Sequence, residues 1–259
     1  MMRFLPRRGS KEPVESTAEM TLVDHLSELR SRIMRSLLAV ILGATFVWVF
    51  STPIFRFLSE PYCNIRPSDD CVFIATGPLD QFSVQLTLAG YGGLILALPV
   101  VLYQIGRFVM PGLYPNEKRM LAPFLMVSVF LLALGMTVAY LFLPRALEVL
   151  SSFSDPDRFE SFFSANVYLN FFVKMLLAFG LAFELPLILV FLQIIGLVQT
   201  ETLRKNRRIA VVLIVILGAI ITPTGDPFTL LVLSLPMYVF FELSLVVGGR
   251  MTKNRLNVS

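Results

Sequence analysis

Residues 121–143 read LAPFLMVSVFLLALGMTVAYLFL, a run without a single charged side chain. About 20 mostly apolar residues are enough for a helix to cross the hydrocarbon core of a bilayer. An open strand edge or an irregular segment would leave backbone hydrogen-bonding groups unsatisfied in lipid, so we expect the run to be helical. This stretch therefore predicts a transmembrane helix.

The same pattern recurs along the whole chain. Hydrophobic residues make up 56% of its 259 residues and charged residues only 15%, a balance that suits lipid-facing surfaces better than the surface of a water-soluble domain. We predict an all-α membrane domain over 20–248, between polar tails at 1–19 and 249–259. Its six apolar runs cover 33–50, 82–105, 121–143, 167–198, 209–221 and 228–247.

The fifth run is shorter than the others. Its helix would be about 20 Å long, whereas the hydrocarbon core is about 30 Å thick. One interpretation is a full crossing, with a locally thin bilayer or with other helices covering the segment. The other is a re-entrant hairpin over 209–247 that does not cross the bilayer. Both interpretations leave the two ends of the chain on the same side.

Basic residues are distributed unevenly between the two sets of loops. Most Lys and Arg residues lie in 1–35, 106–120, 199–208 and 248–259, whereas the opposite set holds only Arg56, Arg66, Arg145 and Arg158. The positive-inside rule places the basic set in the cytoplasm. We therefore expect six membrane crossings, with both termini cytoplasmic.

Glu28 and Glu117 are two of the acidic residues that lie among these cytoplasmic basic residues. Glu28 belongs to an amphipathic helix that begins before the first span, near the capping-box pair Thr21 and Asp24. Glu117 lies in the first cytoplasmic loop. Carboxylates in a partly dehydrated groove suit a guanidinium ligand, because arginine matches a carboxylate in a planar fork and stays charged. Two simpler explanations stay open: Glu28 could pair with Arg32 one turn later, and Glu117 could stabilise the first turn of a helix.

Two ionisable residues lie inside the fourth run. Glu184 is midway along it and Lys174 precedes it by about 15 Å of helix, so Lys174 is not its partner and is expected to extend outward. A buried ionisable group in lipid is costly and normally has a partner or a function. We expect Glu184 to meet a polar residue of another helix, in this chain or in another subunit. Glu242, near the inner end of the sixth run, is expected at the interface.

The sequence gives little support for an enzyme. His25 is the only histidine, which excludes a two-histidine zinc motif within the chain, and no nucleophile elbow or Gly-rich phosphate loop is present. We therefore expect no catalytic residue, metal or cofactor. We also expect no nucleic-acid ligand, because the basic cytoplasmic flanks account for the net charge of +4.

Cys63 and Cys71 lie in the first outer loop, on the side where thiols oxidise. They are either a disulfide or two unrelated small buried residues.

Several motifs, taken together, resemble the TatC family. They occur in order between about residues 20 and 248: HLSELR at 25–30, LPVVLYQ at 98–104, RFVMPGLY at 107–114, EKR at 117–119, AFGLAFELP at 178–186, ITP at 221–223 and LPM at 235–237. The resemblance implies six kinked transmembrane helices in a concave, glove-like bundle, with short fifth and sixth helices.

The resemblance also implies a function. The chain would be a subunit of the Sec-independent twin-arginine translocase that binds the signal peptides of folded precursor proteins, driven by the proton motive force. Glu28 and Glu117 would contact the arginine pair, while Leu29, Arg30 and Phe108 would shape the same patch. Glu184 would face single-span partner subunits of the TatA and TatB type, and the chain would associate with further copies in a larger complex. A secondary transporter with Glu184 and Lys174 on its path is the alternative, although no internal repeat supports it.

Overall fold

The computed structural model describes residues 22–64, 72–75, 77–109, 121–152, 164–221 and 227–256. This part of the chain is built from helices, with one isolated bridge between Ile74 and Ser164, which confirms the all-α class. The helices are α1 (Leu22–Val49), α2 (Ser51–Cys63), α3 (Asp80–Val109), α5 (Leu121–Ser152), α6 (Ala165–Ile194), α7 (Thr200–Lys205), α8 (Arg207–Ile221) and α9 (Pro227–Leu256).

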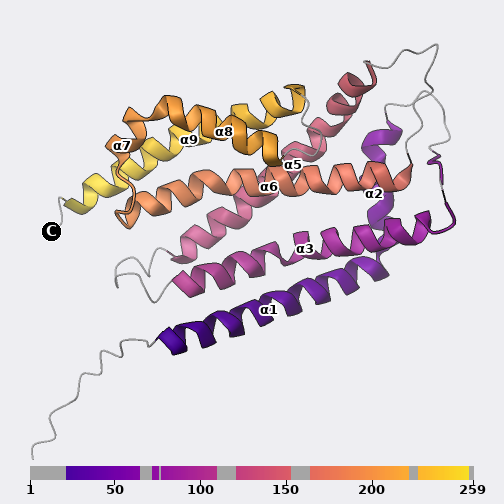
Figure 1. The fold of residues 1–259 in the computed structure, drawn as a ribbon, viewed down its shortest axis with the longest axis horizontal. Helices are drawn as coiled ribbons and strands as arrows, with labels where there is room; N and C mark the ends of the chain where they lie inside the picture. Colours follow the sequence, from indigo (N-terminus) through magenta and orange to yellow (C-terminus); the bar gives the residue numbers. More distant parts are fainter. Residues whose placement is uncertain are drawn as a thin grey trace, which may run out of the picture.

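Five helices in the described ranges are long and apolar enough to cross a bilayer. These spans are Val23–Val49, Asp80–Val109, Ala122–Val149, Ala165–Ile194 and Pro227–Arg250. The fifth predicted run lies in α8, which has only 15 residues, or about 22 Å of helix. The α8–α9 hairpin stops short of the end of the bundle where α3 and α6 begin (Figure 1). Both interpretations of the fifth run therefore stay open.

Several helices end beyond or before the predicted apolar runs. The fourth helix ends at Ile194 rather than at position 198, because the chain turns at Gly196, whose φ of 77° lies in the left-handed region that favours glycine. The sixth helix is not short, since α9 has 30 residues. Its helical structure continues beyond the apolar run into a polar, basic segment that ends at Leu256.

Among the long helices, α1 and α5 run in one direction and α3, α6 and α9 in the opposite direction, with α6 in the middle (Figure 1). α6 packs against α5, α9 and α3, whereas α1 packs mainly against α3 and α8 mainly against α9. In the apolar window of α6, 56% of the residues are buried, against 6% in α1. The core therefore centres on α6, and α1 and α8 lie at the edges with most of their apolar side chains left for lipid.

The contact between α1 and α3 depends on small residues. A Cβ atom added to Gly93 would lie 2.4 Å from the backbone nitrogen of Ala44, and one added to Gly43 would lie 2.7 Å from the carbonyl oxygen of Gly93. Backbone atoms cannot move aside as the end of a side chain can, so both glycines are required for this close approach. Small residues at such crossings are typical of helix packing in membranes, where lipid is as apolar as the helices themselves.

Proline residues interrupt the hydrogen bonding of several helices. Pro99, Pro186 and Pro236 lie inside α3, α6 and α9, as their positions in the predicted runs indicate, and Pro144 lies inside α5. Each proline lacks a backbone donor and its ring crowds the carbonyl one turn earlier, which bends a helix. Neighbouring helices can tolerate such bends in a membrane.

Candidate functional site

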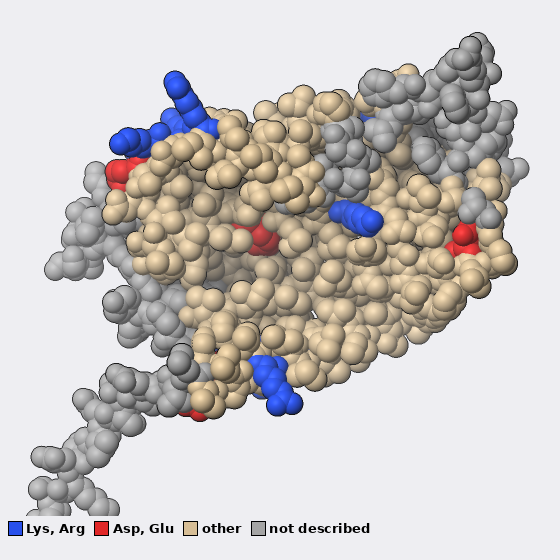
Figure 2. All heavy atoms as spheres, viewed as in Figure 1, with Lys and Arg blue, Asp and Glu red and all other residues tan. Residues whose placement is uncertain are grey.

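Most of the described Lys and Arg side chains gather at one end of the bundle, which we call the basic end. Here α1, α7 and α8 begin and α3, α6 and α9 end (Figure 1). Blue groups lie over α7 and the start of α8 in Figure 2, whereas the middle of that face is mostly uncharged. The basic end holds Arg30, Arg32, Arg35, Arg107, Arg204, Lys205, Arg207, Arg208 and Arg250.

Glu28 lies at this end and is already paired. Arg32, one turn further along α1, donates hydrogen bonds from Nε (3.1 Å) and from a terminal nitrogen to the same carboxylate oxygen, Oε1. The second oxygen of Glu28, Oε2, is buried and has no hydrogen-bond partner. The side chains of Arg32 and Glu28 are 13% and 21% exposed, so this pair is less hydrated than an ordinary surface ion pair. The simpler explanation for Glu28 therefore holds in the isolated chain.

Contacts from α3 complete this part of the basic end. The amide oxygen of Gln104, a buried side chain, lies 3.5 Å from a terminal nitrogen of Arg32. One turn before Glu28, the ring of His25 stacks on that of Phe108 with 4.4 Å between the ring centres. Two helices thus form one patch of a carboxylate, an amide and an aromatic pair.

The other predicted members of the patch differ in how they are placed. Leu29 is half-buried and Arg30 is exposed. Glu117 lies outside the described residues, so its predicted role at the arginine pair stays a prediction. Gln104 lies in the motif at 98–104 and is not among the predicted site residues. The only signal that marks it is a polar side chain near the inner end of an apolar run.

Glu184 lies inside the bundle. It is 5% exposed, and its Oε2 accepts a 2.8 Å hydrogen bond from the hydroxyl of Ser128 on α5. Its other oxygen, Oε1, is buried without a partner. The polar residue expected on another helix is therefore found within this chain, and contact with a second subunit would require the Glu184 carboxyl group to reorient.

Lys174 and Glu242, two further charged residues of the apolar runs, are placed as their positions suggest. Lys174 is exposed although its neighbours on α6 are largely buried, so it is directed away from the core. Glu242 accepts a 2.8 Å hydrogen bond from Arg207 and a 3.2 Å bond from the hydroxyl of Tyr238. The ion pair joins the start of α8 to α9, which supports an interfacial structural role for Glu242.

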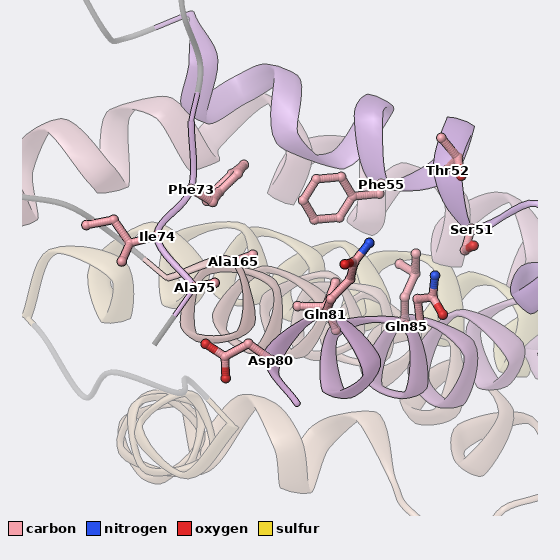
Figure 3. Close-up of a pocket in the computed structure, with 12 residues that line it drawn as sticks. Ser51, Thr52, Phe55, Phe73, Ile74, Ala75, Asp80, Gln81, Gln85 and Ala165 are labelled. Carbon is pink, nitrogen blue, oxygen red and sulfur yellow. The ribbon is translucent and has the colours of Figure 1, made fainter. Parts of the chain in front are cut away.

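A cavity of about 330 Å³ lies at the opposite end of the bundle. Figure 3 shows Ser51, Thr52 and the ring of Phe55 on one side and Gln81 and Gln85 of α3 on the other. Phe55 and Tyr62 pack on Phe73 with ring centres 5.6 and 4.9 Å apart. This aromatic packing fixes the segment 72–75 against α2.

Two further features bear on the sequence predictions. Cys63, the last residue of α2, is disulfide-bonded. Cys71 lies outside the described residues, so its pairing with Cys63 stays a prediction. Among the described residues, no group of three or more His, Cys, Asp or Glu side chains is arranged to hold a metal ion.

Fold and site together define a multi-spanning helical membrane protein with a carboxylate held among cationic side chains at one end. The family model described as Sec-independent protein translocase protein (TatC) matches residues 24–236. The chain belongs to the TatC family, as the motifs predict.

Curated relatives and a solved structure agree with this assignment. A TatC protein of Frankia casuarinae is 36% identical over 89% of this chain and 66% of its own length. One from Aquifex aeolicus is 32% identical over 92% and 99%. A crystal structure described as "Twin Arginine Translocase Receptor- TatC" superposes with a TM-score of 0.75 at 33% identity, over 88% of this chain and 99% of that one. The chain spans about two thirds of the length of the Frankia relative and 63% of a Corynebacterium kroppenstedtii relative.

Proposed function

We propose that this protein is the receptor subunit of a twin-arginine translocase, which binds the signal peptides of folded precursors and exports them independently of the Sec route. The proposal rests on family membership together with one observation, the half-buried carboxylate of Glu28 at the basic end. A guanidinium suits this carboxylate better than the ammonium group of lysine does, because it can form two parallel hydrogen bonds with the carboxylate once the edge held by Arg32 is free.

The proposed peptide site extends beyond Glu28. Glu117 would supply the carboxylate for the second arginine of the pair. Leu29 and Phe108 would offer apolar contact to the residues that follow the arginines, and Arg30 would contribute to the electrostatic shape of the same patch. The exposure of Arg30 and the half-burial of Leu29 support this division of roles.

Orientation and partners follow from the same proposal. The clustering of basic side chains at the end where α1 begins supports cytoplasmic termini in a bacterial inner membrane. We infer that Glu184 serves the assembly with single-span subunits of the TatA and TatB type, through the carboxylate oxygen that Ser128 leaves unpaired, which reaches a partner only after the buried carboxyl group reorients. Transport would use the proton motive force, and further copies of the chain would join the complex. Family membership does not favour the transporter alternative.

Export of a folded reporter protein tests the peptide site. Glu28→Gln and Glu117→Gln keep the shape of the side chain and remove its charge. Each is expected to weaken peptide binding about ten- to hundred-fold, because a hydrogen bond to a charged group contributes about 1.5–3 kcal/mol. Export of a reporter with a twin-arginine signal should fall, while export of a Sec-dependent reporter in the same cells stays unchanged.

Glu201→Gln is the matched control, since Glu201 is an exposed acidic residue on α7 at the same end. Removing the charge of Glu201 is expected to leave the export of both reporters unchanged. Normal export and unchanged peptide affinity in both Glu28→Gln and Glu117→Gln would remove the proposed site. If Glu201→Gln lowered export of the twin-arginine reporter equally, the effect would be explained by general surface charge.

A further inference from the structure

The carboxylate of Glu28 is already paired with Arg32 when no ligand is bound. Both hydrogen bonds from Arg32 end on Oε1, and Oε2 is buried. An arginine from outside therefore finds no free edge of the carboxylate with which to form a two-point contact. For the peptide to bind Glu28, either Arg32 leaves or the carboxyl group rotates away from it.

We propose that Arg32 is an internal competitor for the arginine pair of the signal peptide. It holds Glu28 in the empty receptor and is displaced when a ligand guanidinium takes its place. This inference rests on the proposed function, and it assigns to Arg32 a role in setting the affinity of the same site.

The position of Arg32 favours this exchange. The pair is formed within α1 at a separation of four residues, where side chains lie on one face of a helix. An ion pair of this kind is weak enough to be displaced, even though partial burial makes it stronger than one in open water. A peptide guanidinium brings the same planar fork and the same charge, so little is lost when one arginine replaces the other.

Gln104 provides a second contact for the displaced side chain. Its amide oxygen already lies 3.5 Å from a terminal nitrogen of Arg32, and Gln104 is anchored on α3 with 9% of its surface exposed. Arg32 can therefore leave Glu28 without losing every hydrogen-bond acceptor. A neutral amide is a weaker acceptor for arginine than a carboxylate. Displacing Arg32 from Glu28 therefore costs free energy, which lowers the affinity of the site for the ligand.

Binding of a labelled synthetic peptide with two adjacent arginines followed by an apolar run measures this cost. Arg32→Gln in the purified full chain is expected to bind the peptide about two- to five-fold more tightly, equivalent to about 0.4–1 kcal/mol. Arg35→Gln is the matched control, because Arg35 is an exposed arginine of α1 three residues further on. It removes the same charge from the same helix but frees no carboxylate, so its effect should be clearly smaller.

The double variant separates competition from general charge. In a Glu28→Gln background Arg32 has no carboxylate to occupy, so the added Arg32→Gln change should leave the affinity where Glu28→Gln alone puts it. Arg32→Lys, which keeps the charge but not the fork, should tighten binding less than Arg32→Gln. If thermal unfolding shows that the Arg32→Gln variant is not folded, Arg32→Lys is used for the same comparison.

Each outcome has a defined meaning. Weaker or unchanged binding in Arg32→Gln overturns the inference, because Arg32 would then position Glu28 or be irrelevant to it. Equal tightening with and without Glu28 overturns it as well, in favour of charge alone. If Glu28→Gln itself leaves binding unchanged, the proposed function fails rather than the competition. If Glu28→Gln weakens binding and Arg32→Gln does not strengthen it, only the competition fails.

Discussion

Substitution of Gly93 by alanine tests how α1 is held on the rest of the bundle. The new Cβ atom would lie 2.4 Å from the nitrogen and 2.5 Å from the Cα atom of Ala44, where ordinary contacts begin near 3.4 Å. Because both neighbours are backbone atoms, α1 has to retreat from α3 by at least about 1 Å. Gly90→Ala is the matched control on the same helix, since nothing lies within 4 Å of the atom it adds.

The expected magnitude follows from this geometry. Overpacking of a fitted interface costs about 1–3 kcal/mol, while an alanine that fits stabilises a helix by up to about 1 kcal/mol relative to glycine. We expect Gly93→Ala to be about 1–3 kcal/mol less stable than Gly90→Ala, and each kcal/mol shifts the unfolding midpoint by about 2–4 °C at this chain length. The Arg32–Gln104 contact, already 3.5 Å long, is lost after a rigid retreat of 1 Å.

Trp48 makes the assay specific to this interface. It is the only tryptophan of the chain, it lies on α1, and its ring meets that of Phe82 on α3 with 6.2 Å between the ring centres. Thermal unfolding of the purified protein in detergent, followed through Trp48 fluorescence, compares the two variants with the parent chain. Equal midpoints for Gly93→Ala and Gly90→Ala would refute the reasoning, because the predicted clash would then cost nothing.

Two further predictions concern the core and the outer loop. Glu184→Gln keeps an acceptor for the hydroxyl of Ser128 and should retain near-normal thermal stability, whereas Glu184→Ala leaves that hydroxyl buried without its partner and should be about 1–3 kcal/mol less stable; the reverse ranking in thermal unfolding would show that hydrogen bonding is not what Glu184 supplies. Peptide mapping by mass spectrometry should find Cys63 linked to Cys71 before reduction and two separate peptides after it, and two free thiols without reductant would contradict both the pairing and the outward orientation of that loop.

The number and approximate positions of the apolar helices were predictable from the sequence because lipid imposes a strong local requirement. A crossing needs a long apolar run, and such runs can be counted without knowing what packs on what. The pair between Glu28 and Arg32 was predictable for a related reason: residues four apart on one helix are neighbours whatever the rest of the fold does. The outward direction of Lys174 was also predictable, because Glu184 lies too far along the same helix to pair with it.

Helix ends were harder to predict, since a run of apolar residues marks the membrane and not the helix. α6 ends before its apolar run is complete because Gly196 turns the chain. α9 continues after its run because a polar segment can stay helical in water. Hydropathy reports neither event.

The contacts between helices were decided only by the tertiary structure. Ser128 and Glu184 are 56 residues apart, and Arg32 and Gln104 are 72 apart. Nothing in the sequence around these residues indicates that they meet. The apolar runs are hydrophobic on all sides, so they carry no stripe to show which face packs inward. Lipid is as apolar as the core, and it is therefore the fit of small residues such as Gly43 and Gly93 that selects the neighbour of each helix.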